Sequence, residues 1–118
     1  MREIKCRGYN KELQKWIIGS YVDGYIINGV MESNEEYIVI ERWAPVEKGS
    51  VGQYTGLRDG SGVNIYEKDI AMDKDGLIWE VVFERGRFGL IGLGSRFIRD
   101  DIIIMGNTWE NPELLEED

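Results

Sequence analysis

The side chains that most often carry catalysis are scarce in this chain of 118 residues. It contains no histidine and a single cysteine, Cys6. This excludes an intrachain disulfide, a zinc site built from Cys and His, and the histidine base of Ser-His and Cys-His hydrolases. Ile4, Cys6 and Gly8 alternate with charged neighbours, so we interpret Cys6 as a half-buried strand residue. A reactive thiol would need a cationic partner, and Lys5 and Arg7 point to the other face of such a strand.

Carboxylates are abundant, and one group of them has part of the pattern of a calcium-binding loop. Asp73 and Asp75 precede Gly76, and Glu80 follows it. An EF-hand loop needs a further ligand before the glycine, a glutamate later than Glu80 and flanking helices, and this segment lacks them. We therefore predict a hairpin turn in which Gly76 adopts a positive φ.

Two other patterns have catalytic or nucleotide-binding counterparts but favour a structural explanation. The adjacent acids Glu35-Glu36 and Asp100-Asp101 would point to opposite faces of a strand, so neither pair can flank a sugar as a glycosidase requires. A phosphate-cradling loop needs a helix after its glycines and a lysine at its end. The glycine-rich segment has no such lysine and favours sharply curved strands; its glycines are Gly86, Gly89, Gly92 and Gly94. We expect no metal, no cofactor and no enzymatic activity, because these residues complete no catalytic constellation.

The same segment holds the basic cluster of the sequence, interleaved with Phe88 and Phe97. Its members are Arg85, Arg87, Arg96 and Arg99. A basic and aromatic patch of this kind could bind single-stranded nucleic acid. Arginines on the exposed face of two strands, with both phenylalanines in the core, explain the pattern as well. We favour this second interpretation because patterned charges usually form a solvated face.

The net charge of −8 is concentrated near the C-terminus. Residues 100–118 contain seven acids and no base, whereas residues 1–99 contain 15 acids and 14 bases. A nearly neutral body with an acidic tail binds phosphates poorly, so we expect no nucleic acid partner. We interpret the acidic tail as a segment that keeps the protein soluble, and the alternative interpretation is that its charges mimic DNA.

Hydrophobic residues recur mostly with a period of two, which predicts a mainly β protein. Asp23-Gly24 and Asn28-Gly29 are both typical of hairpin turns, and we favour Asn28-Gly29 because the three residues between them are too few for a full strand. Pro45 lies in the best candidate for a linker, near residues 44–52. This divides the chain into an N-terminal β lobe, residues 1–50, and a C-terminal lobe, residues 51–118. The second lobe is predicted to be a small SH3-like barrel, and Asn111 before Pro112 predicts a capped helical turn after it.

Three segments, in order along the chain, carry a resemblance to a known family. The first segment runs from Ile4 to Lys11 and is followed by Lys15-Trp16-Ile17. The second runs from Val51 to Ile70 and contains the motifs Gln53-Tyr54-Thr55-Gly56-Leu57 and Ile65-Tyr66-Glu67-x-Asp69-Ile70. The third is Gly106-Asn107-Thr108-Trp109-Glu110-Asn111-Pro112. The chain resembles the YopX-like family of bacteriophage and prophage proteins, whose biochemical activity is not established. The resemblance covers most of the chain except roughly residues 20–50.

The residues of this family signature could form a ligand site, but they favour a structural role. Its glycines supply turn geometry, and Asp69 is expected to accept a loop-closing hydrogen bond from the backbone. The family commonly has glycine where this chain has Lys68, so a positive φ there would cost on the order of 1 kcal/mol. The signature residues are Gln53, Tyr54, Thr55, Gly56, Leu57, Tyr66, Glu67, Asp69, Gly106, Asn107, Asn111 and Pro112.

The resemblance and the composition together imply a non-enzymatic phage or prophage accessory protein that binds another macromolecule. A nucleic-acid-binding regulator using the arginines of residues 85–99 is the alternative, and an uncharacterised enzyme comes third. The chain has no run of about 18 apolar residues and no signal-peptide core, so we expect it in the cytoplasm of the bacterial host, away from membranes. We also expect a homo-oligomer, a dimer or trimer, and a host or phage protein as partner.

Overall fold

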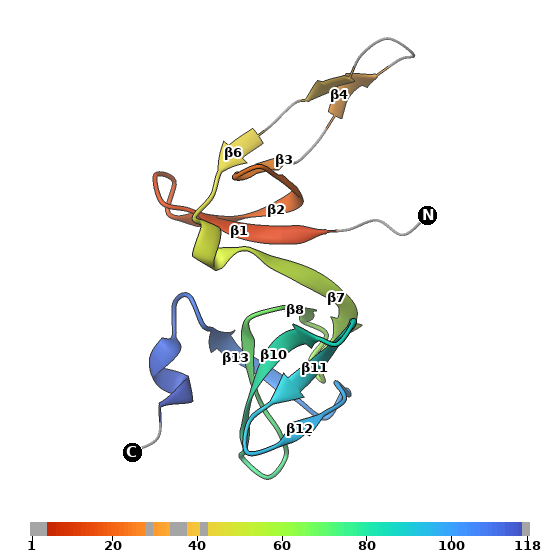
Figure 1. The fold of residues 1–118 in the computed structure, drawn as a ribbon, viewed down its shortest axis with the longest axis vertical. Coiled ribbons are helices and arrows are strands. Elements are labelled where there is room, and N and C mark those ends of the chain that lie inside the picture. Colours follow the sequence, from red (N-terminus) through yellow and green to blue (C-terminus); the bar gives the residue numbers. More distant parts are fainter. Residues whose placement is uncertain (1–4, 28–29, 34–37, 41–42, 117–118) are drawn as a thin grey trace. The chain divides into compact units, whose positions relative to one another are not determined.

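The computed structural model describes residues 5–27, 30–33, 38–40 and 43–116, and these residues form two compact units. The units are Met1–Gln53 and Tyr54–Asp118. Strands dominate both, with two short 3₁₀ turns, which confirms the mainly β class (Figure 1). No helix of the described residues is long and apolar enough to cross a membrane.

The N-terminal unit is built on a hairpin between β1 (Cys6–Asn10) and β2 (Lys15–Val22). Cys6 lies in a strand, as its alternation with charged neighbours predicted, and it is buried where half-burial was expected. Gly8 allows the chain to pass close to Val46, because a Cβ at residue 8 would lie 2.8 Å from the Val46 side chain. The buried Asn10 accepts a hydrogen bond from the Leu13 N–H and donates one to the Pro45 carbonyl.

The turn after β2 is at Asp23-Gly24, so our preference for Asn28-Gly29 over this dipeptide as the site of the reversal was wrong. Val22 pairs directly with Tyr25, so Asp23-Gly24 forms a tight two-residue hairpin turn with φ values of 50° and 93°. The segment between the two predicted turns is a real strand of three residues, β3 (Tyr25–Ile27), because it pairs on both sides. Asn28-Gly29, which we favoured as the reversal, lies outside the described residues.

The remaining elements of this unit are short. β4 (Val30–Ser33) pairs with β5 (Ile38–Ile40). β6 (Trp43–Pro45) pairs with β3 and ends at the proline. The 3₁₀ turn η1 (Lys48–Ser50) then leads into β7 (Gly52–Arg58), whose first residues pair with β1.

The C-terminal unit contains a five-stranded antiparallel sheet in the order β12-β11-β10-β9-β13. β8 (Asn64–Tyr66) pairs instead with β7. The sheet is open, with β12 and β13 at its edges, so closure into an SH3-like barrel is not confirmed for the described residues. Its strands are β9 (Asp69–Met72), β10 (Ile78–Glu84), β11 (Arg87–Ile91), β12 (Ser95–Arg96) and β13 (Ile103–Asn107), and the 3₁₀ turn η2 (Pro112–Leu115) follows.

The core of this unit lies on one face of the sheet. On β10 the buried Trp79 and Val81 alternate with half-buried residues, whereas β9 is buried from Asp69 to Ala71. The turn predicted at Gly76 is confirmed by its φ of 80°. A second turn, Arg85-Gly86, joins β10 to β11. The core residues are Ile65, Ala71, Trp79, Val81, Leu90 and Ile102.

Candidate functional site

The central part of the family signature has a structural role. Thr55 is buried, donates its hydroxyl to the Ile65 carbonyl at 2.8 Å and accepts the Leu57 N–H at 3.1 Å. Gly56, between Thr55 and Leu57, has a φ of 86°, a backbone conformation that residues other than glycine rarely adopt. These contacts fix an irregular pairing between β7 and β8. The Tyr54 ring lies 5.3 Å from the ring of Tyr66 and belongs to the same pairing.

The turn between β8 and β9 follows the prediction from sequence. Asp69 is almost fully buried, and its Oδ2 accepts the Tyr66 N–H at 2.8 Å. Lys68 has a φ of 77°, the conformation for which glycine is better suited. Glu67 is half-buried in this turn, and Leu57 is exposed. Gln53 belongs to the N-terminal unit, where it pairs with Cys6. These signature residues therefore hold turns and strand pairings.

The C-terminal part of the signature positions η2. The Asn107 side-chain oxygen accepts the N–H groups of Trp109 and Glu110, which turns the chain after β13. The Asn111 side-chain oxygen accepts the Asn107 N–H at 3.2 Å and makes no cap bond to η2, so its predicted capping role was wrong. A Cβ at Gly106 would collide with the Asn111 side chain. The predicted helical turn itself exists and starts at Pro112.

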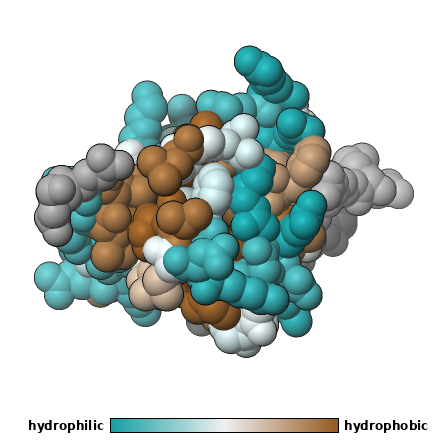
Figure 2. All heavy atoms as spheres, turned by 90° about the horizontal axis from the view of Figure 1, so that it is seen from below, coloured by the Kyte–Doolittle hydropathy of each residue, from teal (hydrophilic) through white to brown (hydrophobic). Residues whose placement is uncertain are grey.

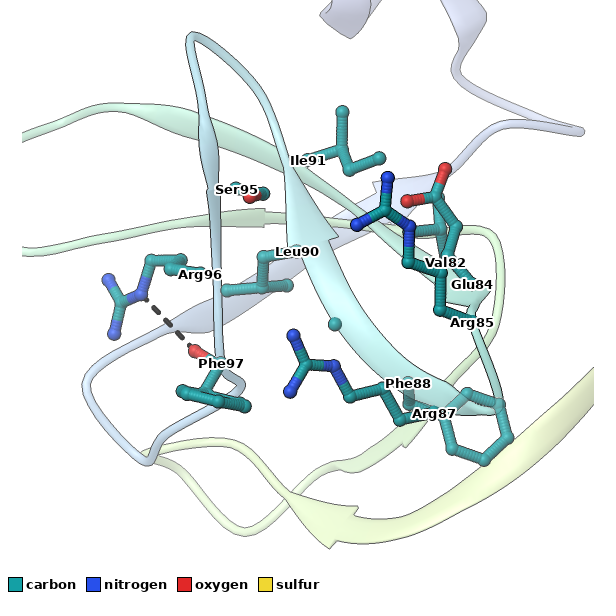
Figure 3. Close-up of a pocket in the computed structure, with 11 residues that line it drawn as sticks. Val82, Glu84, Arg85, Arg87, Phe88, Leu90, Ile91, Ser95, Arg96 and Phe97 are labelled. Atoms are coloured by element: carbon teal, nitrogen blue, oxygen red, sulfur yellow. Dashed lines mark hydrogen bonds between the residues drawn. The ribbon is translucent and has the colours of Figure 1, made fainter.

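Three of the four predicted arginines line one hollow of about 290 Å³ beside the β10–β11 hairpin, which we call the arginine hollow (Figure 3). Gly89 lies opposite Val82 in the sheet and adds no side chain to fill the space. Arg87 places its guanidinium 4.6 Å from the centre of the Phe97 ring, a cation–π contact. The hollow is lined by Val82, Arg85, Arg87, Gly89, Arg96 and Phe97, among others.

The structure corrects our placement of Phe97 in the core. Its side chain is 58% exposed, because β12 is only two residues long and lies at the sheet edge. Phe88 is half-buried and packs edge-on against the exposed Phe83. Arg85 and Arg99 are exposed, and Arg99 does not line the hollow.

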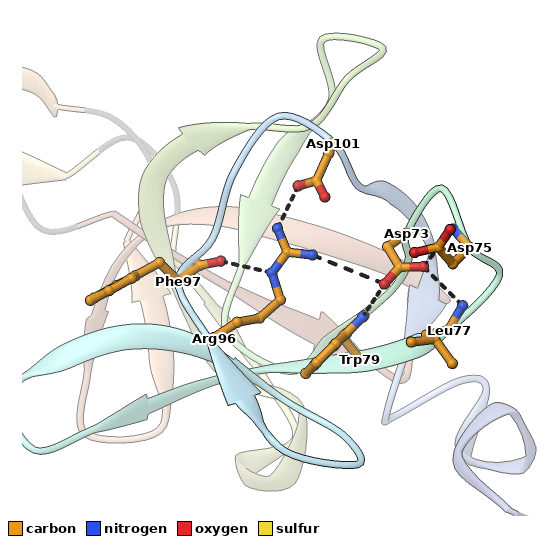
Figure 4. A network of polar contacts seen from close by, with 7 residues as sticks. All are labelled: Asp73, Asp75, Leu77, Trp79, Arg96, Phe97 and Asp101. Atoms are coloured by element: carbon orange, nitrogen blue, oxygen red, sulfur yellow. Dashed lines mark hydrogen bonds and ion pairs between the residues drawn. The ribbon is translucent and has the colours of Figure 1, made fainter.

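Arg96 has a structural role that the sequence did not reveal (Figure 4). Its guanidinium donates to Asp101 at 2.7 Å and lies 4.0 Å from Asp73, which also accepts the Trp79 indole N–H at 2.9 Å. The Trp79 hydrogen bond, aided by backbone donors and Arg96, holds the pKa of Asp73 below its usual value. The Arg96 hydrogen bond likewise lowers the pKa of Asp101. In contrast, Arg85, Arg87 and Arg99 have no ion-pair partner among the described residues.

A second hollow, which sequence reasoning missed, lies between the start of β10, the turn after β11 and η2. We call it the leucine groove; its volume is about 360 Å³. Leu93 stands between Gly92 and Gly94 at the tip of the turn and is 85% exposed. A leucine flanked by two glycines was the signal in the sequence that could have revealed it. The groove is lined by Leu77, Ile78, Trp79, Ile91, Leu93, Leu114, Leu115 and Glu116, among others.

The described residues contain no group of three or more Cys, Asp or Glu side chains placed to hold a metal ion. The two hollows described above differ in chemistry, since one is basic and aromatic and the other is apolar.

Comparison with known proteins supports the resemblance seen in the sequence. A search of curated proteins finds no match. The crystal structure of protein EF1440 from Enterococcus faecalis is similar, with a TM-score of 0.72 and 24% identity over 98% of this chain and 100% of that one. This likeness shows a shared fold. The family model described as "YopX protein" matches residues 5–116. The chain therefore belongs to the YopX family.

Proposed function

We propose that this protein is a non-enzymatic phage or prophage accessory protein that acts in the bacterial cytoplasm by binding another protein. The observation that carries the proposal is the leucine groove. Leu77, Leu93 and Leu115 are all more than a third exposed there, beside the buried Trp79. Burying apolar surface stabilises a complex by roughly 25 cal/mol per Å², and exposed apolar patches of this kind mark interaction sites.

The chemistry of the groove favours a protein over a small molecule. Small-molecule sites combine an apolar pocket with several converging polar groups that fix the ligand's orientation. Among the lining residues of this groove, Glu116 is the one that carries a charge. An apolar surface with a charged rim is typical of the centre of a protein interface.

A pull-down with a matched pair of variants tests the proposal. Tagged wild-type protein, Leu93→Asp and Leu57→Asp are incubated with lysate of the host bacterium, and captured proteins are identified by mass spectrometry. Leu57 is the control because it is 46% exposed in the same unit and lies outside the groove. We expect a partner that wild type and Leu57→Asp retain and Leu93→Asp loses. Identical captured proteins for all three would contradict a role for the groove.

Binding of nucleic acid is the second candidate, and the arginine hollow favours it. Arg85 and Arg87 have no ion-pair partner among the described residues, and Arg87 stacks on an exposed phenylalanine. Arginine and aromatic side chains together form the usual platform for single-stranded bases. Against this candidate, Glu84 also lines the hollow, and residues 54–118 hold 14 acids and seven bases.

Fluorescence anisotropy with a labelled single-stranded oligonucleotide separates the two candidates. We expect no binding tighter than the high micromolar range at physiological salt, because the charge of this unit repels phosphates. Tight binding that weakens steeply with salt and is lost in Arg87→Ala, but kept in Arg99→Ala, would establish the second candidate instead. Arg99 is a suitable control because it is exposed and does not line the hollow.

A further inference from the structure

We infer that the leucine groove receives a basic amphipathic helix of its partner protein, with apolar side chains on the buried face and Lys or Arg on the rim. This inference rests on the proposed function and names the chemistry of the partner. Figure 2 views the molecule from below and shows apolar side chains gathered on one area of that face, with polar side chains beside them.

The groove is a built feature of the fold. Gly92 allows the turn after β11 to lie directly on β10, because a Cβ there would be 2.7 Å from the Ile78 carbonyl oxygen and 3.2 Å from the Trp79 ring. Leu93 follows at once and projects from this turn, which is closed by a hydrogen bond between the Gly92 N–H and the Gly94 carbonyl. The position of the exposed leucine is therefore fixed by packing against the sheet.

The opposite wall of the groove is fixed by the C-terminal part of the family signature. The Thr108 N–H donates to the Lys68 carbonyl at 2.9 Å, which ties the chain after β13 to the β8–β9 turn. Asn107 and Asn111 then direct the chain into η2. η2 carries Leu114 and Leu115 into the groove. These signature residues therefore do more than stabilise the fold, since they hold one wall of the leucine groove.

The backbone bonds at the groove favour an occupant that binds through its side chains. At the start of β10 both backbone groups of Leu77 are used, because its N–H donates to Asp73 Oδ1 and its carbonyl accepts the Asp73 N–H. Gly92 uses its N–H within the turn. An added β-strand needs free backbone donors and acceptors, and these groups of Leu77 and Gly92 are already engaged, whereas a helix presents apolar side chains and keeps its backbone bonds internal.

The charge around the groove selects a basic partner. Glu116 lines the groove and Glu113 belongs to η2, while Asp75 lies two residues before Leu77. Residues 100–118 contain no Lys or Arg, and Lys74 is the base of the neighbouring turn. Charge complementarity favours encounter with a cationic partner and disfavours an anionic one.

The test uses three synthetic helical peptides that differ in one property each. The first has leucines at i, i+3, i+4 and i+7 and lysines elsewhere. The second replaces the lysines with glutamates, and the third replaces the leucines with serines. Binding of each fluorescent peptide to the full chain is measured by anisotropy. We expect the leucine–lysine peptide to bind at least about tenfold more tightly than either of the others, the equivalent of about 1.4 kcal/mol.

Variants of the protein localise the binding. Leu93→Asp should weaken binding of the leucine–lysine peptide by about tenfold or more, although the substitution adds a negative charge. Leu57→Asp should leave this binding unchanged. The double variant Glu113→Gln, Glu116→Gln should weaken binding of the leucine–lysine peptide several-fold. Glu84→Gln, which removes a charge outside the groove, is the control and should leave this binding unchanged. If Leu93→Asp binds this peptide as well as wild type does, or if no peptide binds, the inference is wrong. Equal binding of the lysine and glutamate peptides would refute the basic partner and leave the proposed protein-binding function standing.

Discussion

The carboxylate of Asp59 joins two segments of the C-terminal unit that are far apart in the sequence. Its Oδ1 accepts the N–H groups of Ser61 and Val63, and its Oδ2 accepts the Ile104 N–H of β13 at 2.9 Å. Burial alone would raise the pKa of Asp59, but the backbone donors outweigh it, and the pKa lies below the usual value. The ionised form is therefore the one that stabilises the fold.

Replacing Asp59 with asparagine should destabilise the protein by about 1–3 kcal/mol, because an amide N–H₂ would face a backbone donor without an acceptor between them. Urea unfolding at neutral pH measures this loss. Asp100→Asn removes the same charge at an exposed position and should leave the free energy of unfolding nearly unchanged. An equal effect of the two substitutions would show that net charge, and not the hydrogen bonds of Asp59, matters.

Lys68 offers a prediction of the opposite sign. Its φ of 77° is unfavourable for a side chain with a Cβ, and the two backbone hydrogen bonds of the residue survive a change to glycine. Lys68→Gly should stabilise the protein by up to about 1 kcal/mol, since the strain outweighs the entropy that glycine adds to the unfolded chain. Lys74→Gly, in a turn where φ is not positive, should destabilise it. Chemical denaturation of both variants gives the comparison.

At the scale of elements, the Asp73–Trp79–Arg96–Asp101 network fastens the two-residue strand β12 to the start of β10. The pKa values of Asp73 and Asp101 both lie below the ordinary range. A carboxyl group with a lowered pKa in the folded state contributes stability above its unfolded pKa, near 3.8 here, and loses it as the pH falls through the folded pKa. The network should therefore be intact at neutral pH and lost in acid.

Comparing wild type with Arg96→Met across pH tests this expectation. At neutral pH the variant should unfold at a lower urea concentration, because Asp73 and Asp101 lose their cationic partner. Below about pH 4 the difference should shrink, since the carboxyl groups take up protons first in the unfolded chain and then, at lower pH, in the folded protein. Arg99→Met, which removes an arginine without an ion pair among the described residues, should show no such convergence. A difference that stays constant with pH would contradict the role of the ion pairs.

The elements that sequence could predict were those set by local chemistry. The turn at Gly76 follows from a residue type that adopts positive φ readily. The positive φ of Lys68 was indicated only by the resemblance to a family that commonly has glycine at this position. Asp23-Gly24 was misjudged because a strand of three residues is unconvincing in isolation and becomes stable only when it pairs on both sides. Local pattern cannot show such pairing.

The candidate site was less predictable for the same reason. Phe97 was expected in the core, but its exposure depends on β12 being a short edge strand. Arg96 looked equivalent to its neighbours, and only the fold brings Asp73 and Asp101 to it. The leucine groove joins residues 76–79, 91–93 and 114–116, a proximity that no spacing in the sequence indicates.

At the scale of the whole molecule, charge and apolar surface are divided between the units. Residues 54–118 carry seven of the eight net negative charges and contain both hollows, whereas residues 1–53 are nearly neutral. The N-terminal unit instead exposes apolar side chains along its sheet. Trp43 is 67% exposed and lies 5.0 Å from the ring of Tyr25, and Ile18 and Val22 are also exposed. The two units are thus suited to different contacts.

The N-terminal unit should mediate self-association. Its described strands leave β6 at the edge of the sheet, and β4 and β5 pair only with each other, a two-stranded arrangement that is marginal in water. A unit of this size buries only about 60% of its unfolded surface, so pairing that edge and covering Trp43 against identical copies would add stability.

We therefore predict a dimer or trimer assembled mainly through residues before Pro45, with a molar mass measurable by light scattering behind a sizing column. Trp43→Glu should shift the protein toward monomer, because it places a charge in the apolar surface that the copies would share. Leu93→Asp, in the other unit, should keep the oligomer intact and so separates self-association from partner binding. A clean monomer of wild type at tens of micromolar would refute the prediction, and the exposed side chains of the N-terminal unit would then need a different protein to cover them.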